Sequence, residues 1–190
     1  MTDVSRRALL AALPAGAAAT LAPAAMAEGH GDGFQYEIIR TDDEWRALLS
    51  DDEYAILREG GTERPKSDPL WDSTEAGMYA CKGCDLPVYD ARWKVVLDVG
   101  FLFYRHAEPD SVMTSIDRSV YGQLGGGTGD DGPVVPEGLS EDDLRALDTL
   151  LLIETHCRRC ASHLGHILLV QQKLLHCING TALNFTPETA

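Results

Sequence analysis

From Gly77 onward, short apolar runs alternate with clusters of Gly, Pro and Asp. The runs are rich in Val, Ile, Leu, Phe and Tyr, and they cover residues 78–90, 94–106, 148–157, 166–172 and 174–185. Short runs of this composition, bounded by turn residues, are typical of β-strands. Their spacing predicts antiparallel sheets rather than a regular alternation of strands and long helices.

A short helix is predicted before this region. Thr41 is followed three residues later by Glu44, the pattern of a capping box at a helix N-terminus. After this pattern, Trp45, Leu48 and Leu49 share one helical face.

Two further short helices are predicted by similar patterns. One covers residues 51–59, and the other covers residues 144–150 after an acidic cap that begins at Ser140. Residues 122–138 are rich in Gly, Asp and Pro and are predicted to form a loop. The sequence thus predicts a mainly β domain of the α+β class, without internal repeats.

Composition and charge restrict the possible partners. The chain has 190 residues, of which 44% are hydrophobic, which suits one globular domain with an appendage. Its net charge is −14. An acidic surface repels nucleic acid and anionic lipid, so neither is an expected partner. The same charge also fits a solvated surface with no specific partner.

The amino-terminal residues resemble an export signal. Arg6 and Arg7 precede a weakly hydrophobic run, and residues 25–27 offer the small residues that a signal peptidase needs. The run is too short and too broken by Pro and Gly to anchor the chain stably in a membrane. We expect residues 1–27 to be a twin-arginine-like signal, residues 28–40 to be a linker, and the protein to be exported to the bacterial periplasm.

Four of the five cysteines form two pairs, each with two residues between its members: Cys81 with Cys84, and Cys157 with Cys160. Two such knuckles can supply four thiolates to one tetrahedral zinc ion, a closed structural site. The alternative is a set of disulfides, which persist outside the cytoplasm. Because five is odd, one thiol is left over in either case. We predict one structural zinc ion per chain.

The remaining cysteine is Cys177, in the last apolar run. His163 and His166, three residues apart, follow the second knuckle and would share one side of a helical turn or meet around a bend at Gly165. Imidazoles near a thiol can stabilise its thiolate, and Asn179 adds an amide nearby. The alternatives are that Cys177 is an inert buried side chain and that the histidines serve packing.

Several motifs resemble those of the B-type methionine-R-sulfoxide reductases, over roughly residues 41–186. They are the amino-terminal segment 44–65, the first knuckle within 77–94, the second knuckle with His-Leu-Gly-His within 153–166, and the strand 176–185.

The resemblance implies a fold of two antiparallel sheets with small N-terminal helices and a zinc site. It also implies that Cys177 attacks the sulfur of methionine-R-sulfoxide, protein-bound or free. His163 and His166 would protonate or hydrogen-bond the sulfoxide oxygen, and Asn179 would orient the site. The sulfenic acid that forms on the cysteine would be reduced by an external thiol or a thioredoxin-like partner, because there is no sixth cysteine.

The chain departs from the family pattern around the expected pocket. Phe101 stands where the family has a tryptophan that packs on the substrate methyl group, so an aromatic face remains without the indole N–H. Leu175 and His176 stand where the family usually has Arg and Tyr. An Asp-Gly-Pro loop after His166 is absent, and an extra segment enters at about residues 122–147.

These departures keep three functions open. The first is an exported reductase of methionine-R-sulfoxide, and the second is a zinc-stabilised binding domain that has lost the chemistry. The third is a thiol enzyme that acts on a different sulfoxide.

Overall fold

The computed structural model describes residues 34–117, 119, 128–129, 132–135, 137–148 and 151–189. The predicted export signal, residues 1–27, lies outside the described residues, as does the first part of the predicted linker. No helix among the described residues is long and apolar enough to cross a membrane.

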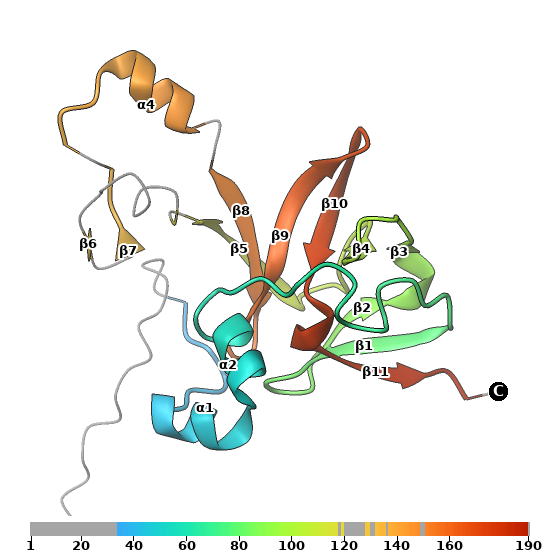
Figure 1. The fold of residues 1–190 in the computed structure, drawn as a ribbon. Coiled ribbons are helices and arrows are strands. Elements are labelled where there is room, and N and C mark those ends of the chain that lie inside the picture. The colour runs from blue at the N-terminus through green and yellow to red at the C-terminus, as the bar shows by residue number, and fades with distance from the viewer. Residues whose placement is uncertain are drawn as a thin grey trace, which may run out of the picture.

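Two antiparallel sheets form the body of the protein (Figure 1). The smaller sheet has the order β11-β1-β2, and its strands are β1 (Gly77–Cys81), β2 (Pro87–Asp90) and β11 (Leu183–Pro187). The larger sheet has the order β3-β4-β10-β9-β8-β5. Its strands are β3 (Lys94–Val95), β4 (Leu102–Tyr104), β5 (Val112–Asp117), β8 (Leu152–Cys157), β9 (His163–Val170) and β10 (Lys173–Ile178). The predicted mainly β fold with two antiparallel sheets is confirmed.

The two amino-terminal helices are α1 (Asp42–Leu48) and α2 (Asp51–Leu57). Both begin with a complete capping box, formed by Thr41 with Glu44 and by Ser50 with Glu53, so four backbone N–H groups that lack helical partners are satisfied. Trp45 and Leu49 are buried, but Leu48 is 53% exposed.

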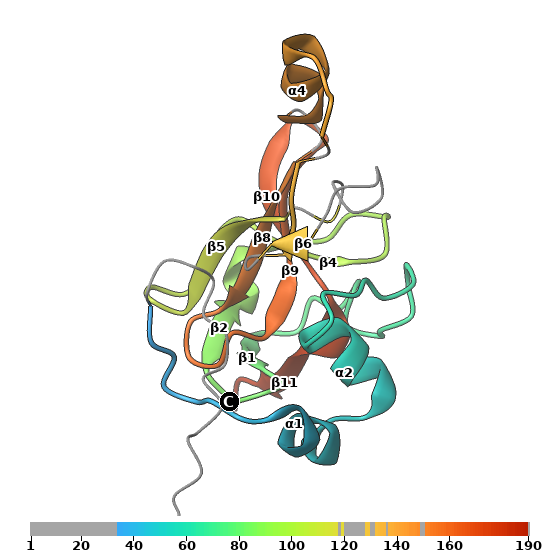
Figure 2. The same cartoon turned by 90° about the vertical axis from the view of Figure 1, so that its left-hand side faces the viewer.

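The extra segment carries the helix α4 (Glu141–Asp148) and the two-stranded pair β6 (Thr128–Gly129) and β7 (Gly132–Pro133). The helix predicted after Ser140 is confirmed, and Ser140 and Asp143 cap it. In both views α4 lies beyond the end of β8, on the side opposite α1 and α2 (Figures 1 and 2). Helix α4 therefore extends away from the two-sheet body.

The main core lies where the sheets meet the helices. Its largest buried side chains include Trp45 of α1, Tyr79 and Tyr89 of the smaller sheet, and Tyr104 of the larger sheet. Tyr89 stacks on Tyr104 with ring centroids 4.3 Å apart. Burial of large aromatic side chains is a major source of stability in a domain of this size.

Residues 34–40 are part of the folded body rather than of a linker. Tyr36 is 7% exposed and its hydroxyl lies 3.0 Å from Nε2 of His156. The N–H of Ile38 donates to the carbonyl of Arg159, 3.0 Å away. The linker predicted over residues 28–40 is therefore wrong for its second half, because an aromatic side chain and a backbone hydrogen bond hold that half against the second knuckle.

The last apolar run, residues 174–185, forms two strands in different sheets. β10 ends at Ile178 in the larger sheet, a 3-10 turn covers Gly180–Ala182, and β11 begins at Leu183 in the smaller sheet. Strand β5, which the apolar pattern did not reveal, pairs with β8 at the edge of the larger sheet. The chain thus passes from one sheet to the other two residues after Cys177.

Candidate active site and metal centre

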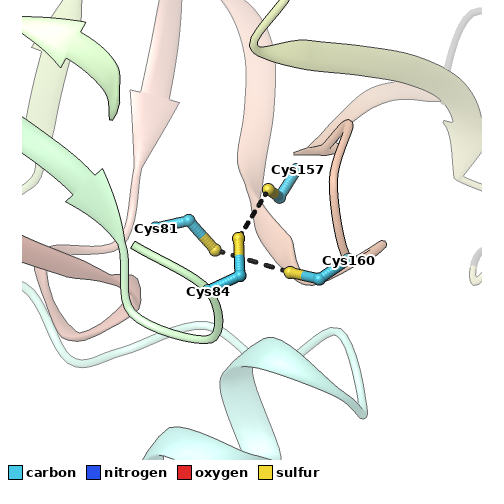
Figure 3. Close-up of side chains that lie close together, drawn as sticks. All are labelled: Cys81, Cys84, Cys157 and Cys160. Atoms are coloured by element: carbon cyan, nitrogen blue, oxygen red, sulfur yellow. Dashed lines mark hydrogen bonds between the residues drawn. The ribbon is translucent and has the colours of Figure 1, made fainter. Parts of the chain in front are cut away.

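The two predicted knuckles bring four thiols together (Figure 3). The sulfur of Cys81 lies 3.7 Å from that of Cys160, and the sulfur of Cys84 lies 3.5 Å from that of Cys157. All four sulfurs lie within 4.8 Å of one another, and none is in a disulfide. In a zinc tetrahedron with bonds of about 2.3 Å, the sulfur–sulfur edges are about 3.8 Å. The four thiols therefore fit a metal ion, and the disulfide alternative is wrong.

Positive charge surrounds the thiol cluster. Guanidinium groups donate to three backbone carbonyls of the knuckles: Arg40 to Gly83, Arg58 to Cys160 and Arg159 to Cys84. The guanidinium carbons of Arg40 and Arg58 also lie 4.7 Å from the ring centroid of Trp45. Cationic groups near thiolates stabilise the charge that four metal-bound sulfurs carry. The amino-terminal helices are thus tied directly to the knuckles.

Cys177 lies within a row of residues that crosses five strands of the larger sheet. Phe103, Cys177, His166, Glu154 and Ser115 stand opposite one another on β4, β10, β9, β8 and β5. Directly opposite residues of antiparallel strands project from the same face, with Cβ atoms about 5 Å apart. We call these five residues the thiol row. It brings the predicted nucleophile beside a predicted histidine, with a carboxylate beyond it.

The second histidine joins the row from the beginning of β9. The rings of His163 and His166 have centroids 5.2 Å apart. A shift in register between Thr155 and His156 pairs His156 with His163 and leaves Leu164 unpaired. This irregularity, next to Gly165, brings both rings together on a strand. The alternative of a helical turn is therefore wrong, and the proximity expected from a bend is confirmed.

Each histidine is bound by a carboxylate. Nδ1 of His163 lies 2.7 Å from Oε1 of Glu154, and Nε2 of His166 lies 2.9 Å from Oδ2 of Asp117. His163 is 4% exposed, and its Nε2 is buried without a hydrogen-bond partner among the described residues. A buried nitrogen of this kind is costly unless a ligand or water satisfies it. It marks the place where a polar group of a substrate would bind.

The resting state of Cys177 differs from the predicted thiolate. Burial, together with the negative charge of Glu63, raises the pKa of the Cys177 thiol to about 11. Burial thus opposes the thiolate form that the nearby histidines suggested in the sequence. The neutral thiol is therefore the favoured form of Cys177 in the unliganded protein.

An apolar wall borders the thiol on the same side of the sheet. Leu97, Phe103 and Leu175 are buried together, and Phe101 and Cys177 are among the side chains that pack against them. Phe101 is thus placed where an aromatic face can contact an apolar group bound near the sulfur. Leu175, which replaces the arginine of the family pattern, is 1% exposed within this wall and brings no charge to the thiol.

Asn179 holds the backbone around the site. Its Oδ1 accepts from the N–H of Glu63, 3.1 Å away, and its Nδ2 donates to the carbonyl of Leu164, 3.1 Å away. The carboxylate of Glu63 in turn accepts from the N–H groups of Gly180 and Thr181. Asn179 is 3% exposed. Its contacts support an orienting role, since they fix the end of β10 against the residue that follows His163.

Four functional candidates were missed in the sequence. Glu154 and Ser115 belong to the thiol row, Asp117 binds His166, and Glu63 lies near Cys177. The only charged residue within the run 150–155 is Glu154, and an acid within an apolar strand pattern is a signal that could have identified it. The others depend on strand β5 and on a loop contact, which the pattern did not reveal.

Comparisons of this sequence with known proteins identify its family. A family model described as the SelR domain matches residues 49–124. Peptide methionine sulfoxide reductase MsrB of Herminiimonas arsenicoxydans is 32% identical over 158 residues, which cover 80% of this chain and 95% of that protein. The MsrB proteins of Thiobacillus denitrificans and Agrobacterium fabrum are 31% and 29% identical, over 78% and 80% of this chain and 95% and 94% of their own lengths. On these findings, this chain belongs to the MsrB family of peptide methionine sulfoxide reductases.

Proposed function

We propose that this protein reduces methionine-R-sulfoxide to methionine and that Cys177 is the nucleophile. The observation that carries the proposal is the thiol row, which sets Cys177 opposite His166 while the buried, unpartnered Nε2 of His163 lies close by. A sulfoxide oxygen leaves only when it is protonated, so a nucleophile needs acids next to it. Family membership supports methionine sulfoxide as the substrate class.

The first step transfers oxygen from the substrate to the enzyme. The thiol of Cys177 gives its proton to His163 or His166 as its sulfur attacks the sulfoxide sulfur, and the histidine passes that proton to the sulfoxide oxygen. The transient bond between the two sulfurs then breaks as the hydroxyl moves from the substrate sulfur to the sulfur of Cys177. The substrate S–O bond is thus broken, a Cys177 S–O bond is formed, and the single proton ends on the oxygen of the sulfenic acid. The substrate sulfur gains two electrons and Cys177 loses two. The raised pKa of Cys177 fits this balance, since the resting thiol carries the proton that the products require.

Regeneration needs a thiol from outside the chain. The sequence has five cysteines, and four of them form the cluster of thiols that fits a metal ion. Two external thiols would reduce the sulfenic acid to Cys177 thiol and water and would become a disulfide. A dithiol such as that of a thioredoxin-like protein has the required chemistry.

The apolar wall supports recognition of the methyl group of the substrate. Phe101 packs with Leu97, Phe103 and Leu175 beside Cys177, and a methyl group bound there would be removed from water. The oxygen of the same sulfur would then lie toward the histidines. The preference for the R epimer rests on the family resemblance.

The decisive experiment measures turnover of the R and S epimers of a methionine sulfoxide peptide with dithiothreitol. Wild type is compared with Cys177→Ser, and Arg46→Ala, which removes an exposed ion pair with Glu59 in the amino-terminal helices, serves as a control. We expect wild type and the control to reduce the R epimer and Cys177→Ser to be inactive. Equal rates for wild type and Cys177→Ser would overturn the proposal.

The second candidate function is a binding domain without turnover. The observation that favours it is the raised pKa of Cys177 together with the neutral, buried Leu175 where the family has arginine. Calorimetric titration with the sulfoxide peptide separates the two functions. Binding of the peptide by wild type without formation of methionine would support the binding domain.

For the metal centre we propose one structural zinc ion held by Cys81, Cys84, Cys157 and Cys160. Their sulfur–sulfur distances and the surrounding guanidinium groups support it. Four thiolate ligands leave no position for water, so the ion would cross-link the two knuckles and take no part in the reaction.

We also propose that residues 1–27 direct export to the periplasm. The support is the sequence of this segment alone, with Arg6 and Arg7 before a weakly hydrophobic run. Fractionation of cells that produce wild type or the Arg6→Lys, Arg7→Lys variant is the test. Cytoplasmic retention of both proteins would contradict the proposal.

A further inference from the structure

The two histidines beside Cys177 are bound through different ring nitrogens. His163 is held through Nδ1 by Glu154 on β8, and His166 is held through Nε2 by Asp117 on β5. The first contact joins neighbouring strands of the larger sheet, and the second joins strands that are separated by β8. The nitrogens that remain are Nε2 of His163 and Nδ1 of His166. The pair therefore leaves one nitrogen of each kind for a ligand.

Both carboxylates are in the ionised form at neutral pH. Burial opposes ionisation of Glu154, but hydrogen bonds from His163 and Ser115 prevail and lower its pKa to about 2. Burial also opposes ionisation of Asp117, and hydrogen bonds from Ser119 and His166 outweigh it, so the pKa of Asp117 lies below its usual value. An ionised carboxylate only accepts hydrogen bonds. The hydrogen atoms of the neutral rings are therefore fixed on Nδ1 of His163 and Nε2 of His166.

The orientation of Glu154 is fixed as well. Its Oε1 accepts from His163, and its Oε2 accepts from the hydroxyl of Ser115, 2.8 Å away on β5. With both oxygens hydrogen-bonded, the carboxylate has one orientation. Glu154 also stands opposite His166 in the strand pairing, and this position fixes where its side chain meets His163. Asp117 is held in a similar way by the N–H of Ser119, 2.8 Å from Oδ1. Each carboxylate has a second contact that keeps it in place.

We infer that Glu154 and Asp117 are positioning residues for the proposed reduction, which fix the ring orientation and tautomer of His163 and His166. In this arrangement the proton that the Cys177 thiol gives up is taken by Nε2 of His163 or Nδ1 of His166 and is passed from there to the sulfoxide oxygen. The two carboxylates do not touch the substrate and act only through their histidines. The inference rests on the proposed function for its kinetic part, whereas the tautomers belong to the protein without substrate.

The first test is nuclear magnetic resonance of protein with 15N-labelled histidine, at a pH where the rings are neutral. We expect wild type to carry hydrogen on Nδ1 of His163 and on Nε2 of His166. Glu154→Ala should abolish the fixed tautomer of His163 and leave His166 unchanged, and Asp117→Ala should do the reverse, because alanine offers no acceptor to the ring. Tyr36→Phe, which removes a different hydrogen bond to a histidine, should change neither ring. Wild-type tautomers opposite to these, or variants that leave them unaltered, would overturn the inference.

The second test is a double-mutant cycle on the single-turnover rate of sulfoxide reduction. Glu154→Gln should slow the reaction by at least about tenfold in wild type and by much less in a His163→Ala background, because a residue that acts through His163 has no effect once the ring is gone. Equal losses in both backgrounds would indicate a structural role and contradict the inference. If Glu154→Gln does not fold, as judged by circular dichroism, Asp117→Asn with His166→Ala provides the same cycle.

The two proposals fail in different ways. A wild-type protein that does not reduce the sulfoxide would refute the proposed function, and the resonance experiment would still decide whether the carboxylates set the tautomers. An active wild type whose cycles show equal losses would leave the function intact and refute the positioning role.

Discussion

Gly165 lies against the backbone of Cys177 where β9 and β10 pair. A Cβ atom at Gly165 would overlap the carbonyl oxygen of Cys177 and lie 2.9 Å from Cα of Ile178. Only hydrogen fits at this position. The close approach of β9 and β10 keeps Cys177 beside His166 and near His163, which lies at the start of β9.

Gly165→Ala should therefore force β9 and β10 apart. We expect it to lower the free energy of unfolding by about 2 kcal/mol, a typical cost of overpacking, and to lower activity more than stability alone explains. The matched control is Gly60→Ala, since Gly60 also has a positive φ but has no atom within 4 Å of its Cβ position. That control should cost about 1 kcal/mol and leave activity unchanged. Urea unfolding and turnover measure both effects, and equal activity in the two variants would contradict the prediction.

The raised pKa of Cys177 predicts slow alkylation at neutral pH. Because the pKa is about 11 instead of the usual 9.0, the thiolate fraction at pH 7 should be about 100-fold lower than that of an ordinary cysteine. The rate of iodoacetamide labelling at Cys177, followed by peptide mass spectrometry, should keep rising with pH well above 9. The same protein in urea is the control and should show an ordinary midpoint. A labelling midpoint at or below 9 in the folded protein would refute the prediction.

Phe101 is expected to contribute to substrate affinity. Phe101→Ala removes an aromatic face from the wall beside Cys177 and should raise KM about tenfold, a typical effect when a small apolar group of the substrate loses its contact. Phe101→Trp should lower KM, because it adds contact area and an N–H donor. Phe185→Ala, which removes a partly buried aromatic side chain from the main core, is the control and should reduce stability without raising KM. An unchanged KM in Phe101→Ala would exclude Phe101 from the binding site.

Loss of a metal ligand should affect folding before chemistry. Protein purified from the cytoplasm should contain about one zinc ion per chain, and Cys81→Ser should lower Tm strongly because metal binding and folding are coupled. Cys177→Ser, the matched change of sulfur to oxygen outside the cluster, should leave both zinc content and Tm close to wild type. Elemental analysis and calorimetry provide the measurements. A wild-type protein without zinc, or equal zinc content in both variants, would contradict the proposed centre.

Local patterns were sufficient for most of the elements and for the cluster of four thiols. The apolar runs and turn residues predicted the antiparallel strands, and the pattern Thr41 to Glu44 predicted a capping box, because both depend on residues close in sequence. The knuckles were also readable, since two thiols separated by two residues can face one ion whatever the rest of the fold. Cys177 was then identified as the one cysteine outside the two knuckles.

The neighbours of Cys177 could not be predicted from local patterns. Strand β5, a register shift on β8 and the passage from β10 to β11 decide that Glu154 and Asp117 meet the histidines. Such contacts join residues distant in sequence, and a change of one residue in register would turn a strand's side chains to the other face. The proton on Cys177 likewise depends on burial and on Glu63, which no local pattern contains. The sequence by itself determined which groups are available for chemistry, whereas the tertiary structure decided their pairing and charge, because pairing and desolvation arise only when separate strands pack.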